Sequence, residues 1–258
     1  MDVIESFSLK DRVAVVTGGA GLYGRQIVEA LAEAGAKTIT ASRNVKKIEG
    51  VAEALRGRGL NVRARPLDQG DEDSVVRLRD EVVGEFGQVD VLVNNAVLRP
   101  MKQELSRKQW EESMRVNATG LYLMTEYFSQ PMVERKKGSI VNVGSIQGMI
   151  GPDLSLYEGL EGVWTIPDYY FHKGGMINFT RYMASLLGQS NVRVNCISPG
   201  GFFNNQPEPF LTRYNARTFL GRMANASDLK GVIVFLASDA SGYITGTNLP
   251  VDGGYTAK

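Results

Sequence analysis

The sequence predicts a single α/β domain built around a doubly wound parallel sheet. Short β-branched segments alternate with longer amphipathic segments along all 258 residues. The first short segment, residues 12–17, is almost entirely apolar, which is typical of a strand buried on both faces. No linker or repeat interrupts the chain, which is long enough to bury one large core.

Each predicted strand is followed by a crossover helix, so the strands should pair in parallel with helices on both faces of the sheet. After the first strand, a helix at 25–34 stops at Gly35, where glycine can adopt a left-handed conformation. Further strands are expected at 37–41, 62–67, 89–93, 139–143, 192–197 and 247–251, and further helices at 45–56, 72–86, 107–133, 169–187 and 226–237. Together these segments give a seven-stranded sheet.

Composition and charge limit the classes of binding partner that are expected. The net charge is +1 and residues of both signs are interspersed, so neither nucleic acid nor an anionic membrane is an expected partner. The single cysteine, Cys196, lies in an apolar run and should pack in the core. The first residues are acidic and no apolar run is long enough to cross a membrane, so a cytoplasmic location is expected.

Two stretches, 147–167 and 200–220, break the alternation of strands and helices. Both are rich in glycine, proline and aromatic residues. They are therefore interpreted as loops beside a ligand, forming the walls of a substrate site.

A glycine cluster lies between the first strand and the first helix. Gly18, Gly21 and Gly24, together with Leu22 and Tyr23, form a turn whose backbone N–H groups and helix dipole suit a pyrophosphate. This position within a βαβ unit favours dinucleotide binding over a purely structural turn.

The end of the second strand bears on the choice of dinucleotide. Ser42, Arg43 and Asn44 stand where an acidic residue would bind the adenosine ribose of NAD, and a guanidinium instead suits the 2′-phosphate of NADP. NADP is therefore expected, with NAD as the alternative, although Arg43 could simply be solvated. Asp68, after the third strand, either accepts a hydrogen bond from adenine or caps the helix that begins near Asp71.

The glycine turn and five further motifs together resemble the short-chain dehydrogenase/reductase family over nearly the whole chain. The matching motifs are Thr17–Gly24 (TGxxxGxG), Asn94-Asn95-Ala96 (NNAG), Asn117, Ser145, Tyr169–Lys173 (YxxxK) and Pro199-Gly200. The resemblance implies a Rossmann-type domain and a nicotinamide dinucleotide cofactor. The expected cofactor-binding residues are Gly18, Gly21, Leu22, Tyr23, Gly24, Ser42, Arg43, Asn44, Asp68, Gln69, Asn95, Ala96, Lys173, Pro199, Gly200 and Phe202.

The chain departs from the family pattern at three places. Leu22 occupies the position of the middle glycine, with Gly21 one residue earlier. Val97 replaces the last glycine of NNAG. The interval between the predicted serine and tyrosine is longer than usual, and the extra residues fall within 151–167. The first two changes concern cofactor binding and the third concerns the substrate pocket.

Tyr169 is the predicted proton-transfer residue. A tyrosine pKa is ordinarily about 10, so transfer near neutrality needs a cation that stabilises the phenolate. Lys173 lies four residues later on the same helical face, whereas Tyr170 has Gly174 at that offset. A Tyr and a Lys at this spacing also occur by chance. The family motifs, however, favour catalysis.

Two further residues complete the predicted catalytic group. Ser145 follows a strand at the carboxyl edge of the sheet, where its hydroxyl could bind the substrate oxygen. By resemblance, Asn117 holds a water that connects Lys173 to solvent. His172, the only histidine, has no second ligand beside it in the sequence and is expected to pack in the core or lie exposed, so no metal is expected.

The two loops carry hydroxyl, amide, carboxylate and aromatic side chains that would suit a sugar, sugar acid or polyol. They also resemble the sugar and sugar-acid dehydrogenases of the family. The candidate substrate residues are Gln147, Tyr157, Glu158, Trp164 and Asn204. These residues could instead stabilise the loops or an oligomer contact.

Three other functions remain as alternatives. One is a redox-sensing regulator that binds NADP without turnover. Another is an NAD-dependent dehydrogenase of a non-sugar alcohol. A third, internal oxidation and reduction as in epimerases, is disfavoured because those enzymes carry an additional substrate domain. The family resemblance also implies a homotetramer that uses the helices at 107–133 and 169–187.

Overall fold

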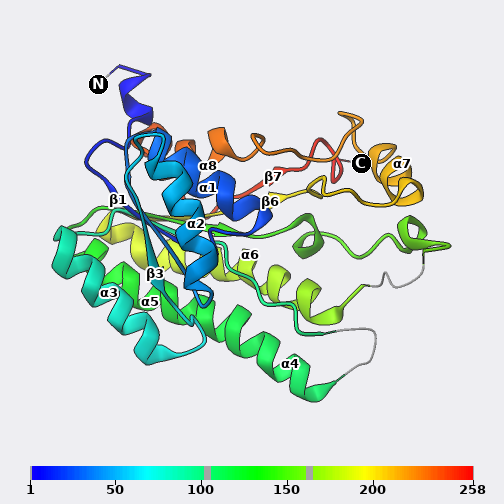
Figure 1. Cartoon of the computed structure of the whole chain (residues 1–258), viewed down its shortest axis with the longest axis horizontal. Coiled ribbons are helices and arrows are strands. Elements are labelled where there is room, and N and C mark those ends of the chain that lie inside the picture. Colours follow the sequence, from blue (N-terminus) through cyan, green and yellow to red (C-terminus); the bar gives the residue numbers. More distant parts are fainter. Residues whose placement is uncertain (1, 102–105, 161–164, 258) are drawn as a thin grey trace.

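The computed structural model describes residues 2–101, 106–160 and 165–257. They form one domain around a seven-stranded parallel sheet with the order β3-β2-β1-β4-β5-β6-β7 (Figure 1). The strands are β1 (Val13–Thr17), β2 (Lys37–Ser42), β3 (Val62–Pro66), β4 (Val91–Asn94), β5 (Gly138–Val143), β6 (Val192–Pro199) and β7 (Asn248–Val251). The predicted doubly wound, seven-stranded sheet is confirmed.

The strand order places the site. β1 pairs with β2 on one side and with β4 on the other, so the winding of the chain reverses between β1 and β4. In such sheets ligands bind in the crevice at the carboxyl ends of the strands at this reversal. The glycine turn after β1 and the Asn95 turn after β4 flank that crevice.

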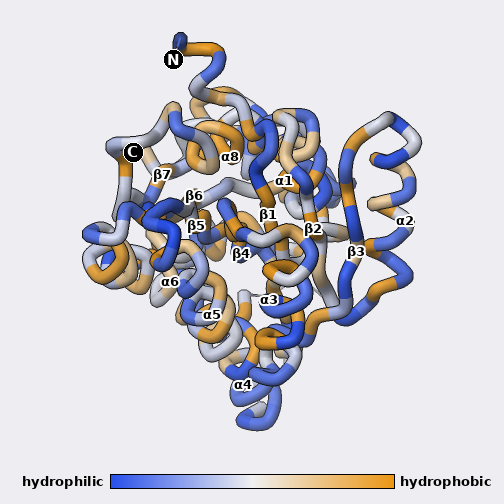
Figure 2. Tube along the Cα trace, turned by 90° about the vertical axis from the view of Figure 1, so that its left-hand side faces the viewer, coloured by the Kyte–Doolittle hydropathy of each residue, from blue (hydrophilic) through white to orange (hydrophobic). Residues whose placement is uncertain are grey.

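Helices cover both faces of the sheet. In Figure 2 the sheet is seen edge-on, with helices above and below it. The helices are α1 (Leu22–Glu33), α2 (Val45–Arg56), α3 (Glu72–Phe86), α4 (Arg107–Met114), α5 (Gly120–Glu134), α6 (Pro167–Leu187), α7 (Glu208–Asn215) and α8 (Lys230–Ala237). One apolar core joins α1, α2 and α8 to the sheet, and a second joins α3, α5 and α6 to its other face. Burial of these two cores is the main stabilising contribution to the fold.

Three segments differ most from the sequence expectation. The helix expected at 107–133 is α4 and α5 joined by a π-helical segment, Arg115–Thr119. The loop expected at 200–220 contains α7, because Phe210 and Tyr214 pack into a small apolar cluster there. The last helix begins at Lys230 rather than 226, because Asn225 and Asp228 form a hydrogen-bonded turn before it.

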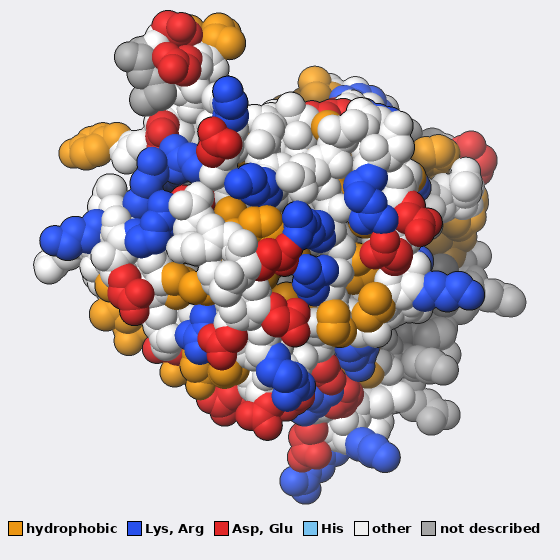
Figure 3. Space-filling model, turned by 60° about the vertical axis from the view of Figure 1, so that its left-hand side comes forward, with side chains coloured by type: hydrophobic (Ala, Val, Ile, Leu, Met, Phe, Trp, Pro, Cys, Tyr) orange, Lys and Arg blue, Asp and Glu red, His pale blue; other side chains and the backbone are white. Residues whose placement is uncertain are grey.

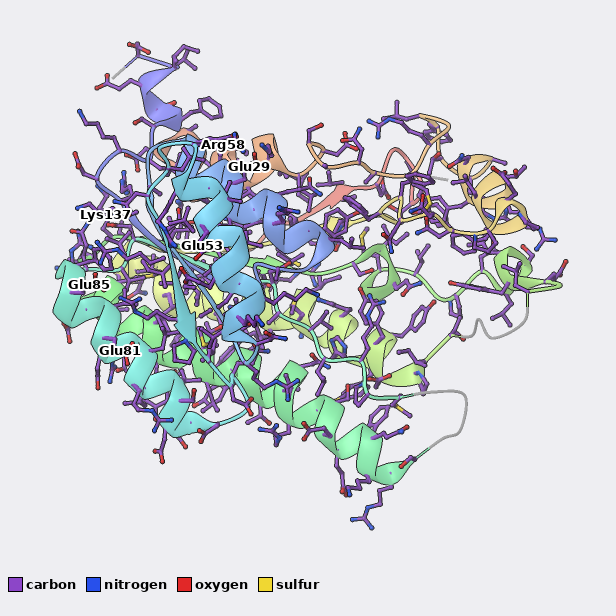
Figure 4. All side chains as sticks on the ribbon, in the orientation of Figure 1. Glu29, Glu53, Arg58, Glu81, Glu85 and Lys137 are labelled. Carbon is purple, nitrogen blue, oxygen red and sulfur yellow. The ribbon has the colours of Figure 1, made fainter. Side chains whose placement is uncertain are left out.

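The surface carries charges of both signs. Figure 3 shows lysine, arginine, aspartate and glutamate side chains interspersed over one face. Several of them are paired between elements, as Arg58 is with Glu29 and Glu33 of α1; Figure 4 labels Arg58 and Glu29 side by side. Among the described residues, no helix is long and apolar enough to cross a membrane.

Candidate active site

A cavity of about 850 Å³ opens at the carboxyl ends of the central strands. The two predicted loop regions contribute to its walls, together with the glycine turn and the start of α6. The predicted site residues that line it are Gly18, Gly21, Leu22, Tyr23, Gly24, Ser42, Arg43, Asn44, Asp68, Gln69, Asn95, Ala96, Ser145, Gln147, Tyr157, Tyr169, Lys173, Pro199, Gly200 and Phe202. Residues far apart in the sequence therefore meet at one site.

The glycine turn has the shape of a phosphate cradle. Gly18 has a left-handed φ of 71°, and a Cβ on Gly24 would lie 2.2 Å from the Gly18 carbonyl oxygen. Gly21 is the N-cap of α1, and Leu22 starts the helix half exposed, so a side chain at that position fits without strain. Within the described structure, the N–H groups of residues 22–24 have no hydrogen-bond partner. These donors at a helix N-terminus fit a dinucleotide pyrophosphate.

Asn95 and Ala96 hold this turn in place. The Thr17 hydroxyl accepts hydrogen bonds from the N–H groups of Asn95 and Ala96, at 3.1 and 2.9 Å. The Asn95 amide donates to the carbonyls of Thr17 and Gly18, at 2.9 and 3.1 Å. Asn95 therefore supports the cradle through the backbone, a role that the motif alone did not reveal.

Tyr23 connects the glycine turn to the turn after β6. Its hydroxyl donates to the Gly200 carbonyl at 2.7 Å, and its ring meets Phe202 edge-on with 5.3 Å between centroids. Burial raises the pKa of Tyr23, so this hydroxyl stays protonated and keeps donating. The two sides of the crevice are therefore bridged by one side chain.

Two exposed cations stand at the adenosine end of the cavity. One is Arg43, as predicted, and the other is Lys47 in the first turn of α2, which no motif indicated. Asn44 caps α2 by accepting a hydrogen bond from the Lys47 N–H at 3.0 Å. Ser42 also lines this end of the cavity.

Asp68 and Gln69, which follow β3, also line the cavity. Asp68 accepts from the Gly70 N–H at 3.0 Å, and Asp71 is the residue that precedes α3, so the alternative that Asp68 caps this helix is wrong. The Gln69 amide donates to the Val116 carbonyl at 2.8 Å. This bond ties the turn after β3 to the π-helical segment.

Tyr169 and Lys173 lie one turn apart on α6, with Ser145 across from them at the end of β5. The Lys173 ammonium is buried, donates to the Val143 carbonyl at 2.5 Å and lies 5.8 Å from the centre of the Tyr169 ring. Burial lowers the pKa of Lys173, an effect that the neighbouring Tyr169 partly offsets. The hydrogen bond to the Val143 carbonyl holds the Lys173 ammonium near Tyr169.

The electrostatic surroundings separate Tyr169 from Tyr170. Burial alone would raise the pKa of Tyr169, but the positive charges of Lys173 and Arg99 outweigh it and hold this pKa below 10.0. Burial raises the pKa of Tyr170, which has no such cation beside it. Of these two adjacent tyrosines, only Tyr169 is therefore prepared for proton transfer.

Arg99 was not predicted from the sequence. It follows the Asn95 turn and lines the cavity, and its guanidinium carbon lies 4.2 Å from the centre of the Tyr169 ring. The signal that could have found it is its position four residues after Asn95, at the carboxyl edge of the sheet where ligands bind.

Asn117, which the family resemblance assigned to a water beside Lys173, is held by backbone contacts in the structure. It lies buried in the π-helical segment and is not among the residues that line the cavity. Its amide oxygen accepts from the Leu98 N–H at 2.8 Å, and its amide nitrogen donates to the Leu98 carbonyl at 2.7 Å. The side chain is thus engaged in holding the segment that leads to Arg99.

The predicted substrate residues divide into three groups. Gln147 and Tyr157 line the cavity. Glu158 and Asn204 are exposed and do not line it, so their prediction as wall residues is not supported. Trp164 lies outside the described residues.

Aromatic side chains form the far wall of the cavity. Four rings follow one another from Tyr157 to Phe210, Tyr214 and Tyr255, with centroid distances of 5.5, 5.8 and 4.9 Å. Apart from Tyr157, this wall was missed because α7 and the C-terminal segment bring it together over a long sequence separation.

An arginine clamp fixes the segment that contains Tyr157. Arg217 pairs with Asp153 and donates to the Ser155 hydroxyl at 2.5 Å, while Arg213 donates to the Glu158 carbonyl at 2.6 Å. These contacts join α7 and the residues after it to the long segment before α6. The outer side of the aromatic wall is therefore tied by charge-assisted hydrogen bonds.

His172 is a buried residue beside the site. Its ring lies edge-on to Tyr169 with 5.3 Å between centroids, and neither ring nitrogen has a hydrogen-bond partner. Burial, with the charges of Lys173 and Arg99, lowers the pKa of His172 to about 3. In the described ranges, no group of three or more His, Cys, Asp or Glu side chains could hold a metal.

This neutral histidine should make stability depend on pH. Below pH 6.5 the unfolded chain binds a proton at His172 that the folded chain does not, so stability falls as pH decreases toward 3. The replacement His172→Leu should remove this contribution, which is roughly 1.4 kcal/mol per pH unit at most. Urea unfolding at pH 7, 6 and 5 measures the difference. An identical pH dependence in both proteins would contradict the prediction.

The fold and this cavity define a doubly wound, nucleotide-binding α/β protein. A family model described as enoyl-(acyl carrier protein) reductase matches residues 21–256. The chain belongs to the short-chain dehydrogenase/reductase family and is an oxidoreductase of the CH–OH or carbonyl group.

Relatives of known activity match over nearly their full length. The chain is 35% identical to cis-4-hydroxycyclohexanecarboxylate dehydrogenase of Sinomonas cyclohexanicum, over 96% of this chain and 97% of the relative. It is 32% identical to 2-dehydro-3-deoxy-D-gluconate 5-dehydrogenase of Escherichia coli, over 99% and 100%. A gluconate 5-dehydrogenase from Burkholderia cenocepacia, solved with NADP and tartrate, has a TM-score of 0.89 and 28% identity over the whole of both chains.

Proposed function

We propose that the protein is an NADP(H)-dependent oxidoreductase that uses Tyr169 as its general acid and base. The observation that carries the proposal is the pairing of Tyr169 with the buried Lys173 in the cavity, where a phenol of lowered pKa faces Ser145. A bound nicotinamide would supply or accept the hydride. The protein then needs only to move one proton and to orient the reacting carbon.

In the reductive direction, the substrate carbonyl carbon gains the hydride and its oxygen gains a proton from the Tyr169 hydroxyl. Ser145 hydrogen-bonds this oxygen as negative charge develops on it. Lys173 stabilises the phenolate that remains, and the bond to the Val143 carbonyl holds the ammonium in place. Oxidation of the alcohol runs through the same groups in reverse, with the Tyr169 phenolate as base.

The adenosine end favours NADP over NAD. Arg43 and Lys47 are exposed and line the cavity, and among the described residues neither forms a close ion pair, although the charge of Arg43 acts on Glu112. Two such cations match the negative charge of the 2′-phosphate of NADP. The ribose hydroxyl that NAD carries at this position would leave both cations without an anionic partner. The neighbour from Burkholderia cenocepacia, solved with NADP, gives independent support.

The choice of cofactor can be tested at Arg43. The replacement Arg43→Ala should weaken NADPH binding by about 10- to 100-fold and NADH binding much less, because it removes a charge-assisted bond to the phosphate. Titration of nucleotide fluorescence measures both dissociation constants. Lys46→Ala is the matched control, since Lys46 is an exposed cation three residues further along, in the first turn of α2, and does not line the cavity. Equal losses for both nucleotides, or a wild-type preference for NADH, would refute the NADP assignment.

The substrate we propose is a sugar, sugar acid or polyol. Aromatic rings on the far wall suit the face of a carbon skeleton, and Gln147 offers a polar partner for hydroxyl groups. The gluconate and deoxygluconate dehydrogenases among the relatives support this class. NADP⁺ mixed with a panel of sugars, sugar acids and polyols should give NADPH absorbance with at least one of them.

A regulator without turnover is the competing function. It predicts tight NADPH binding with no reaction for any substrate in the same panel. The lowered pKa of Tyr169 argues for turnover, because binding alone gives no reason to prepare a phenol for proton transfer.

We also propose a homotetramer that uses α5 and α6. Exposed large side chains on these helices support it: Tyr122, Phe171, Tyr182 and Leu186 are each 49% exposed or more. Apolar surface of this kind is typical of an interface between copies of a chain.

A further inference from the structure

Arg99 is a cation of the cavity to which the proposed proton transfer assigns no contact with the substrate. It reaches the cavity from the segment after β4 and is exposed there. Its guanidinium covers one face of the Tyr169 ring. The Arg99 guanidinium is therefore available to a ligand that binds in the cavity beside Tyr169.

The other charged groups in the described lining are accounted for. Arg43, Lys47 and Asp68 lie at the adenosine end, after β2 and β3. Asp153 is paired with Arg217, and Lys173 is buried against the Val143 carbonyl. Arg99 is thus the one cation in the described lining that faces the substrate end, is exposed and lacks an anionic partner.

Resting on the proposed function, we propose that Arg99 binds a carboxylate of the substrate, so that the preferred substrates are hydroxy and oxo acids rather than neutral sugars or polyols. The guanidinium offers a planar pair of donors that matches a carboxylate in two hydrogen bonds. It lies over the ring of Tyr169 and, like Ser145, also hydrogen-bonds the phenolic group. A substrate held by its carboxylate at Arg99 therefore presents a nearby carbonyl or alcohol to Tyr169.

The same contact couples the substrate to the chemistry. The charged groups that act on Tyr169 are Lys173 on its own helix and Arg99 from the segment after β4. Ser145, His172 and the protonated Tyr23 are its neutral neighbours. Arg99 helps to lower the pKa of Tyr169. A carboxylate bound at Arg99 offsets that charge and brings the pKa of Tyr169 back up. An acid and its neutral analogue should therefore be oxidised with different pH profiles.

The first test compares acids with their primary amides. The pairs are gluconate with gluconamide, and cis-4-hydroxycyclohexanecarboxylate with its carboxamide. We expect kcat/KM of the wild type to be about 10- to 100-fold higher for the acid than for the amide of a reactive pair. This ratio corresponds to the loss of a charge-assisted bidentate contact. In Arg99→Met this preference should fall to near one, and Arg99→Lys should restore part of it. A preference near one in the wild type, or one unchanged by Arg99→Met, would overturn the proposal.

The pH dependence of kcat distinguishes substrate binding by Arg99 from a purely structural role of this residue, because a structural role would not make the pH profile differ between acid and amide. In the wild type, the rise of the oxidation rate with pH should lie lower for the amide than for its acid. Arg99→Met should shift both profiles to higher pH, because it removes a positive charge beside Tyr169 whether or not a carboxylate is bound. Arg107→Met is the control, because the Arg107 side chain is 91% exposed on α4 and does not line the cavity. Coincident acid and amide profiles in the wild type would contradict the coupling.

Failure of this proposal can be told from failure of the proposed function. If neither acids nor amides react although NADPH binds, the oxidoreductase activity on these substrates is refuted. Calorimetric titration of gluconate and of tartrate into the NADP⁺-saturated protein then tests Arg99 alone. Binding that is lost in Arg99→Met supports the carboxylate site, and no binding to the wild type, or equal binding to both proteins, overturns it.

Discussion

Replacing Tyr169 with phenylalanine should lower kcat by roughly 10³-fold or more, at the upper end of the range for loss of a general acid. The substitution removes only the phenolic oxygen, so the ring can still pack against His172 and under Arg99. NADPH should bind with nearly unchanged affinity, because the glycine turn and the adenosine end are untouched. Single-turnover oxidation of NADPH measures the chemical step, and fluorescence titration measures binding.

The neighbouring tyrosine provides the control. Tyr170 also lines the cavity, but burial raises its pKa and no lysine lies one turn after it. Tyr170→Phe should therefore retain most of the activity. Near-normal turnover in Tyr169→Phe, or an equal loss in the two variants, would exclude Tyr169 as the proton-transfer residue.

The fold was predictable because its signals are local. A buried parallel strand is apolar throughout, and the helices between the strands carry an apolar stripe, so the order of elements follows from short windows of sequence. The exceptions depend on distant contacts. Helix α7 forms where Phe210 and Tyr214 meet Tyr157 and Tyr255, and no local pattern in 200–220 indicates those partners.

The candidate site was predictable where residues stand at the ends of strands. The turns after β1, β4, β5 and β6 meet at one edge of the sheet, so residues such as Gly18, Asn95, Ser145 and Gly200 had to lie near one another. Side-chain direction was not predictable in the same way. Asn117 lies in the π-helical segment and hydrogen-bonds the Leu98 backbone, a contact that no motif indicates.

Charge in the cavity was the least visible feature. Lys47 and Arg99 belong to no motif. They are candidate ligand-binding residues because they line the cavity, are exposed and have no anionic partner among the described residues. Glu158, by contrast, is acidic and close to the tyrosine in sequence, yet Arg213 binds its backbone on the outer side of the wall. Sequence identifies the charged residues, but packing decides which of them face a ligand.

Removing the charge of Lys173 should have the second-largest effect. Lys173→Met keeps the length and packing of the buried side chain but removes the cation that lowers the pKa of Tyr169. The oxidation rate rises with pH as Tyr169 ionises, so this rise should move up by roughly one to three pH units. At neutral pH, kcat should fall by about 10²-fold or more, as expected when an acid–base group is disabled.

The pair Tyr169 and Lys173 should act as a unit. If Lys173 works through the tyrosine, the double variant Tyr169→Phe with Lys173→Met should be scarcely slower than Tyr169→Phe alone. Lys46→Met, on the surface of α2, controls for loss of a lysine elsewhere. Thermal unfolding separates a structural loss from a catalytic one, because a merely unfolded variant would lose NADPH binding as well. An unchanged pH profile in a folded Lys173→Met protein, or strictly multiplicative losses in the double variant, would show that the ammonium acts independently of Tyr169.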